Sequence, residues 1–231
     1  MIKQFDGFKV SYREFTADEA VLGISFDKDI FFSQIPEYVP EPHHTIIDVG
    51  AHIGAFSLLA ASKVPKGRVY AVEASIESYR YLCENVSINN ANIIPFHLAL
   101  TDQTGTCTLY HDKEIETWGH SIVKEFSATN AKETVACYTL KDFLDMNQIS
   151  RCNFIKFNCE GAEFPIILSS PEYVLRQFDY ALISYHRDLI NTYTESDIIQ
   201  HLTNAGFETR LFKKSYESPL RGWIAAKNRQ I

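Results

Sequence analysis

The chain has 231 residues, of which 45% are hydrophobic, and its formal net charge is −7 at pH 7. This length and hydrophobic content are typical of one α/β domain with a sizeable core, and they exclude a disordered chain. The net negative charge and the lack of a basic run argue against nucleic acid as the main partner, because phosphate binding needs clustered Lys and Arg.

The sequence has no apolar stretch near the length of a membrane span and no signal-peptide pattern at its start. Its five cysteines are odd in number and lack C-x-x-C spacing, which disfavours disulfides and a thiolate zinc site. We therefore expect a cytoplasmic protein that binds no metal, no membrane and no nucleic acid. A homo-oligomer is left open.

Residues 1–44 precede the first core strand and are expected to form an N-terminal cap segment. A strand is predicted at 8–12, and a helix is predicted with Thr16 as its N-cap, because Glu19 three residues later completes a capping box. A second helical piece is predicted at 29–38, before a run of prolines. The segment is expected either to cover a ligand site or to pack on the edge of the sheet.

From Ile46 onward, short apolar strands alternate with helices. This pattern predicts an α/β fold with a Rossmann-like, doubly wound and mostly parallel sheet of seven strands. Strands are expected at 46–49, 68–72, 93–100, 154–158, 180–185, 207–212 and 222–227, the last two as a C-terminal antiparallel hairpin. Helices are expected at 55–62, 75–89, 140–146, 165–169, 173–176 and 195–205. A β insertion lies near 105–139, and 1–231 is expected to be one domain with its binding core at 45–231.

The first core strand leads into a turn, Gly50-x-x-x-Gly54, and then into a helix. The turn departs from G-x-G-x-x-G, which disfavours a dinucleotide and an NAD-dependent oxidoreductase. Asp48 before the turn would repel a phosphate and suit an ammonium group. Glu73 ends the next strand, about 20 residues on, where a ribose partner is usual in doubly wound folds. An acid for ribose, a partner for ammonium and no pyrophosphate cradle together indicate S-adenosylmethionine (SAM).

Four motifs occur in the order seen in the FkbM family of SAM-dependent methyltransferases, which the chain resembles from about Asp18 to Ala226. They are Asp48–Ser57, Val69–Ala74, Ala99–Asp102 and Ile155–Glu163. The resemblance implies a class I methyltransferase fold and O-methylation of a hydroxyl on a sugar or secondary-metabolite acceptor. The chain departs from the family at three positions: His52 replaces Asn, Asn158 replaces Asp, and Ser184 replaces an acid.

The cofactor site is expected at the carboxyl ends of the first strands, where ligands bind in open α/β sheets. Its predicted residues are Asp48, Gly50, His52, Gly54, Glu73, Ala74, Asp102 and Asn158. Asp102 is expected either to approach the adenine amino group or to serve as a turn residue before Gly105.

The acceptor site is expected where the fourth and fifth strands end beside the first. Lys156, Glu163, Trp118 and His120 are predicted to contact the acceptor, although Glu163 could instead cap its own helix. His186 is predicted to be the general base, since an unperturbed His has a pKa near 6.5, and Glu160 is predicted to position it or the acceptor. A surface histidine without a role is the alternative. N-methylation of an amine or amide, and a non-catalytic SAM-binding module, are the alternative functions.

Overall fold

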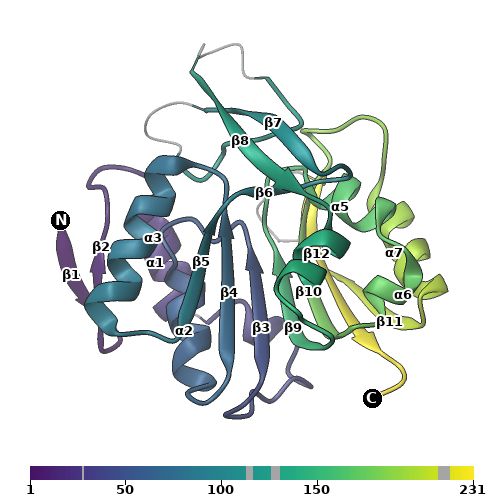
Figure 1. Ribbon diagram of the computed structural model, residues 1–231, viewed down its shortest axis with the longest axis horizontal. Helices are drawn as coiled ribbons and strands as arrows, with labels where there is room; N and C mark the ends of the chain where they lie inside the picture. The colour runs from purple at the N-terminus through teal and green to yellow at the C-terminus, as the bar shows by residue number, and fades with distance from the viewer. Residues whose placement is uncertain (28, 113–116, 126–130, 213–218) are drawn as a thin grey trace.

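The computed structural model describes residues 1–27, 29–112, 117–125, 131–212 and 219–231 (Figure 1). Among them, a central sheet has the strand order β11-β12-β10-β9-β3-β4-β5. β12 is antiparallel to both of its neighbours and the other pairs are parallel. The predicted mostly parallel seven-stranded sheet with a closing hairpin is therefore confirmed. The strands are β3 (Thr45–Val49), β4 (Arg68–Glu73), β5 (Ile93–His97), β9 (Cys152–Phe157), β10 (Phe178–His186), β11 (Phe207–Phe212) and β12 (Arg221–Asn228).

The strand order reverses at β3. The chain moves outward from β3 to β4 and β5, and then returns to place β9 on the other side of β3. Val49 near the end of β3 pairs with Val72 of β4 and with Phe157 of β9, and Phe157 pairs with Ile183 of β10. β3 and β9 therefore end level, while β4 extends one residue and β10 three residues further at the edge where open α/β sheets bind ligands.

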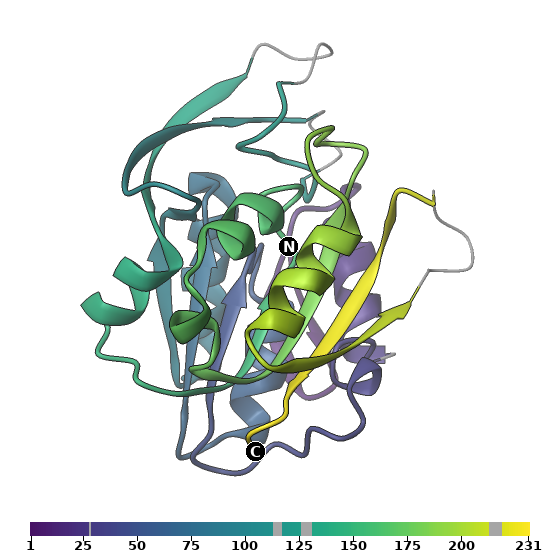
Figure 2. The same cartoon turned by 90° about the vertical axis from the view of Figure 1, so that its right-hand side faces the viewer.

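Helices cover both faces of this sheet (Figures 1 and 2). Alternate residues of β3 supply the two cores, with Ile46 in one and Ile47 and Val49 in the other. The bounds of the six helices predicted after residue 45 differ from those observed by at most two residues. One face carries α1 (Asp18–Leu22), α2 (Ala55–Lys63) and α3 (Ile76–Asn89); the other carries α4 (Leu140–Met146), α5 (Glu163–Ser169), α6 (Glu172–Leu175) and α7 (Glu195–Asn204).

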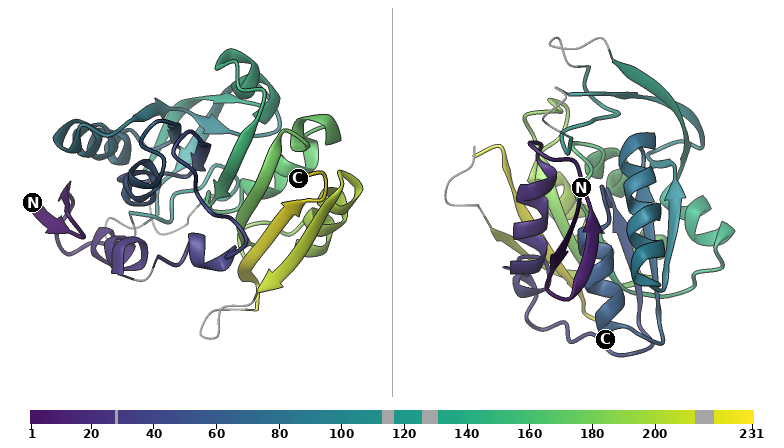
Figure 3. Two further views of the ribbon diagram at one scale, coloured as in Figure 1. Left: turned by 90° about the horizontal axis from the view of Figure 1, so that it is seen from below. Right: turned by 90° about the vertical axis from the view of Figure 1, so that its left-hand side faces the viewer.

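The N-terminal segment begins with a hairpin of β1 (Ile2–Phe5) and β2 (Phe8–Ser11), which lies beside α3 (Figure 3). The expected strand at 8–12 is confirmed, whereas its partner β1 was not predicted. Buried Asn85 of α3 fixes the hairpin, because its side chain accepts the amide of Ser11 at 2.6 Å and donates to the carbonyl of Ile53 at 2.8 Å. The N-terminal segment is thereby attached to the turn that follows β3.

The two helix predictions in this segment differ from the structure to different degrees. The first helix begins at Asp18 with Ala17 as its N-cap, one residue later than predicted, and the Thr16 hydroxyl accepts the Asp18 amide at 3.2 Å. Of the helix expected at 29–38, only η2 (Phe32–Gln34) is helical, after a π-helical turn η1 (Gly23–Asp27). Tertiary packing explains this, since Phe31, Phe32 and Tyr38 place their rings 4.8–5.1 Å from those of Phe56 and Phe154.

The β insertion is confirmed as a second sheet above the carboxyl ends of the central strands (Figure 1), with the order β6-β8-β7. Its strands are β6 (Ala99–Leu100), β7 (Gly105–Tyr110) and β8 (Lys132–Tyr138). The single strand predicted at 93–100 is divided, because β6 leaves the central sheet after His97 and pairs with β8. Within this insertion, 113–116 and 126–130 lie outside the described residues.

Candidate functional site

The turn after β3 is held by backbone hydrogen bonds. The amides of Gly50 and Ala51 donate to the carbonyl of Val72 at 3.0 and 2.9 Å. Gly50 has φ +78°, and a Cβ there would lie 2.0 Å from the carbonyl oxygen of Asn158. Any side chain at position 50 would therefore clash with the backbone just after β9, a constraint that the sequence did not show.

Glu73 ends β4 and anchors the same turn. Its Oε2 accepts the amide of His52 at 2.7 Å, and its Oε1 accepts the amide of Ser75, the N-cap of α3, at 2.8 Å. His52 has φ +54°, a left-handed conformation that is uncommon outside glycine, and the bond to Glu73 holds it there. A carboxylate has about four acceptor positions, so Glu73 keeps acceptor capacity for a ligand.

Asp48 is fully buried behind the turn, and its cationic partner comes from the protein. Lys156 Nζ lies 2.6 Å from Asp48 Oδ1 and donates to the carbonyl of Gly50 at 3.2 Å, while the Ser57 hydroxyl donates to Asp48 Oδ2 at 2.6 Å. The sequence suggested that Asp48 would meet an ammonium group of a ligand. Instead, the Lys156 ammonium neutralises this buried charge and connects the ends of β3 and β9.

A cavity of about 110 Å³ opens at this edge of the sheet. Apolar side chains form one part of its wall, among them Val72, Leu98 and Leu100. An apolar slot beside a carboxylate is suited to a flat heterocycle joined to a sugar. The predicted residues that line it are Gly50, His52, Glu73, Ala74, Trp118, His120, Lys156, Asn158 and Glu160.

A second cavity, of about 300 Å³, adjoins the first. The two have five lining residues in common: Val21, Phe31, Trp118, Asn158 and Glu160. The second is also lined by Ser184, His186, Arg221 and Trp223 from the ends of β10 and β12. Two adjoining cavities that meet at Asn158 and Glu160 suit a reaction between two bound molecules.

His186 at the end of β10 lies between two carboxylates. Its Nδ1 is 3.1 Å from Glu163 Oε1, which also accepts the His186 amide at 2.7 Å, and its Nε2 is 3.3 Å from Glu160 Oε1. Glu163 is further fixed by the amide of Gly161 at 3.0 Å. This geometry places the Nδ1 proton on the side of Glu163 and leaves Nε2 facing Glu160.

Burial and neighbouring charges together shift the pKa values of His186 and Glu160. Burial lowers the pKa of His186, but the carboxylates of Glu160 and Glu163 outweigh it, so the pKa is raised. Burial raises the pKa of Glu160 against the opposing effects of His186 and Arg221, whose Nη1 is 3.8 Å from Glu160 Oε2. The raised pKa of each group favours its protonated form.

Four predicted site residues do not line either cavity. Asp48 is buried behind the turn, and Gly54 packs against Leu82 of α3. Asp102 is exposed and accepts the hydroxyl of Thr101 at 3.0 Å, which favours the turn role over contact with adenine. Glu163 lies behind His186, where it orients the ring.

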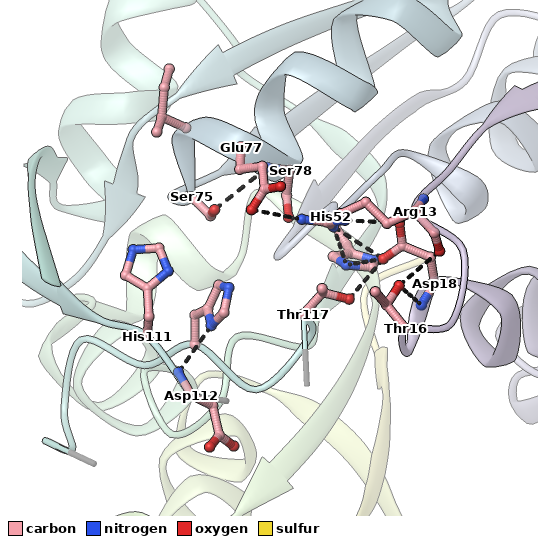
Figure 4. Close-up of polar contacts among 12 residues, drawn as sticks. Arg13, Thr16, Asp18, His52, Ser75, Glu77, Ser78, His111, Asp112 and Thr117 are labelled. Atoms are coloured by element: carbon pink, nitrogen blue, oxygen red, sulfur yellow. Dashed lines mark hydrogen bonds and ion pairs between the residues drawn. The ribbon is translucent and has the colours of Figure 1, made fainter. Parts of the chain in front are cut away.

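A second histidine cluster, which sequence reasoning missed, joins the turn to the N-terminal segment (Figure 4). His52 Nε2 lies 3.1 Å from both Asp18 Oδ1 and Arg13 Nη2, and Arg13 Nε donates to Asp18 Oδ2 at 3.0 Å. Arg13 Nη1 also lies 3.3 Å from Glu77. Arg13 and Asp18 look like ordinary surface residues in the sequence, so no pattern there could have identified them.

The fold belongs to a known class of enzymes. A precorrin-6y C5,15-methyltransferase from Geobacter metallireducens superposes with a TM-score of 0.51 at 12% identity, covering 96% of this chain and 94% of that one. The architecture is thus that of class I methyltransferases, as the sequence predicted.

The methyltransferase FkbM domain matches residues 48–209, and the chain belongs to this family. The expected enzyme class, a SAM-dependent methyltransferase, is thereby confirmed. A hexuronic acid methyltransferase from Haloferax volcanii is 18% identical over 215 residues, which cover 92% of this chain and 84% of the relative. A tRNA(Phe) aminocarboxypropyltransferase from Methanocaldococcus jannaschii is 34% identical over 59 residues, a match that spans only about a quarter of either protein.

Two further features of the described residues bear on partners. No helix in these ranges combines the length and the apolar character that a membrane crossing requires. No group of three or more His, Cys, Asp or Glu side chains in the same ranges is arranged to hold a metal ion.

Proposed function

We propose that the enzyme transfers a methyl group from SAM to an oxygen of a small acceptor, a sugar or secondary metabolite with a free hydroxyl. One observation carries this proposal: the first cavity carries the features expected for SAM and adjoins a second, larger cavity at Glu160, beside His186. Bound SAM supplies an activated methyl group, so the chain needs to position two molecules and remove one proton.

The first cavity fits the donor in three ways. Glu73 is fixed by two amides and retains acceptor capacity for ribose hydroxyls. Val72, Leu98 and Leu100 offer an apolar surface to adenine. Because Lys156 neutralises Asp48, the floor of the turn carries no unpaired buried charge.

His186 is proposed as the general base. Glu163 accepts a hydrogen bond from the Nδ1–H and fixes the ring, as the third member of a nucleophile–base–orienter arrangement does. Nε2 then faces the second cavity as the acceptor of the hydroxyl proton. Glu160, 3.3 Å away, stabilises the charge that forms on the imidazole.

The second cavity supports a polar acceptor with an apolar face. Trp118, Trp223 and Phe31 supply aromatic surface, and Glu160, Ser184 and Arg221 supply polar groups. Carbohydrate rings present this combination of C–H faces and hydroxyl edges. The hexuronic acid named for the Haloferax volcanii relative is an acceptor of the same chemical class.

The experiment is a labelled-methyl transfer assay with a panel of glycans, uronic acids, phenols and amines. Mass spectrometry would identify both the methylated atom and any nucleoside that co-purifies. We expect SAM-dependent labelling of an oxygen, and loss of that labelling in His186→Ala. Labelling confined to amines would replace this proposal with N-methylation. SAM binding without labelling of any acceptor would favour a non-catalytic module.

A further inference from the structure

A buried carboxylate, Asp18, joins three segments that lie far apart in the sequence (Figure 4). Its Oδ1 accepts the hydroxyl of Thr117 at 2.7 Å and lies 3.1 Å from His52 Nε2. Its Oδ2 accepts the amide and the Nε of Arg13 at 2.9 and 3.0 Å. The N-terminal segment, the turn at residues 50–54 (the cofactor turn) and the described loop at residues 117–120 (the insertion loop) therefore meet at one side chain.

The segments joined by Asp18 line both cavities. Val21 of α1 and Trp118 of the insertion loop line the two cavities together. From the same two segments, Ser25 and His120 also line the first cavity, and Ile24 and Gly119 also line the second. The hydrogen bond from Thr117 to Asp18 thus links the two segments that line both cavities directly.

The environment of Asp18 keeps it ionised. Burial alone would raise its pKa, but hydrogen bonds from His52 and Arg13 outweigh this and lower the pKa well below its usual range. A buried carboxylate is costly when it loses a partner. The three segments are therefore stabilised as one closed arrangement, and loss of one contact weakens the others.

We propose that Asp18 is a positioning residue for methyl transfer, which holds the cofactor turn through His52 and the insertion loop through Thr117 over both cavities. The inference rests on the proposed function, because it assumes that the first cavity holds the cofactor. Retention of a bound adenosyl compound then depends on a hydrogen bond between residues 99 positions apart.

The test measures binding of S-adenosylhomocysteine to the full chain by calorimetry and its dissociation rate by surface plasmon resonance. Thr117→Val removes the hydroxyl at nearly constant volume and should raise the dissociation rate about 5–20-fold, whereas Thr117→Ser should stay within about 2-fold of the parent. Asp18→Asn should weaken binding about 10–100-fold. The effects of Thr117→Val and His52→Asn on affinity should be non-additive, since both act through Asp18.

Asp179→Asn is the matched control. Asp179 is also buried and accepts hydrogen bonds from Arg151 at 2.9 Å and Asn153 at 2.7 Å, at the opposite, amino-terminal end of β10. It should lower the melting temperature but leave the affinity unchanged. If the parent binds the ligand and Thr117→Val and Asp18→Asn do so equally well, Asp18 is only structural and the inference is overturned. If the parent itself does not bind, the proposed function fails and this inference fails with it.

Discussion

Among the described residues, His52 and His186 lie in buried clusters that differ in how their charges are balanced. His52 lies against one carboxylate, Asp18, which already has the guanidinium of Arg13 as its partner. His186 lies between two carboxylates, Glu160 and Glu163, with one guanidinium 3.8 Å from the first.

This difference matches the proposed roles, which are positioning for His52 and proton transfer for His186. In the first cluster the acid is satisfied by arginine, so His52 serves to connect the cofactor turn with the N-terminal segment. In the second, two carboxylates outweigh the effect of burial and raise the pKa of His186, so the imidazole holds a proton more tightly than a free histidine does. The carboxylates beside His186 favour its protonation, which supports the proposed role of its imidazole as a proton acceptor.

The largest expected effect is on turnover. His186→Ala should lower kcat by roughly 10²–10⁴-fold and leave the affinity for S-adenosylhomocysteine within a few-fold of the parent, because it removes the base alone. His52→Ala should do the reverse, weakening cofactor binding more than it slows the bound complex. Steady-state kinetics with calorimetry separates the two. A parallel loss of affinity in both variants would remove the distinction between the clusters.

The next largest effect concerns the acid that anchors the turn. Glu73→Ala should weaken binding of S-adenosylhomocysteine about 10–100-fold, because each lost hydrogen bond to a charged acceptor costs about 1.5–3 kcal/mol. Part of that loss comes from the freed amide of His52, which Glu73 holds at 2.7 Å. Calorimetry is the measurement. An affinity equal to that of the parent would place the ribose elsewhere.

A smaller effect is expected on the pH dependence of turnover. His186 must be neutral to accept a proton, and its pKa is raised, so kcat should rise with pH through a midpoint above 6.5. Glu160→Gln removes an anionic neighbour and should move that midpoint to lower pH, by about one unit. A pH–rate profile of each variant checks this. Movement to higher pH would show that Glu160 does not stabilise the imidazolium.

The smallest effect is expected for Asp102. Because its side chain is exposed and lines neither cavity, Asp102→Ala should change cofactor affinity by less than about 2-fold. Calorimetry measures this affinity, with Glu73→Ala as the variant against which the change is compared. A loss comparable to that of Glu73→Ala would restore the contact with adenine that the sequence suggested.

The sequence by itself determined the class of fold, and it predicted the edge of the sheet at which we propose the site. Alternating apolar strands and helices predicted the sheet, and a glycine turn followed by an acid at the end of the next strand predicted which edge binds the cofactor. These features are readable because they are local: the period of apolar residues, the need for glycine at a left-handed turn, and the position of a residue at a strand end depend only on nearby sequence.

Only the tertiary structure decided what each polar residue does at that edge. It paired Asp48 with Lys156, placed Glu163 behind His186, and brought Asp18 to His52 and Thr117. It also divided the strand predicted at 93–100, because β6 pairs with β8. Each of these outcomes depends on charges or backbone groups that meet only after the chain has folded. The pKa of a buried side chain is set by those neighbours in space, whatever their distance along the sequence.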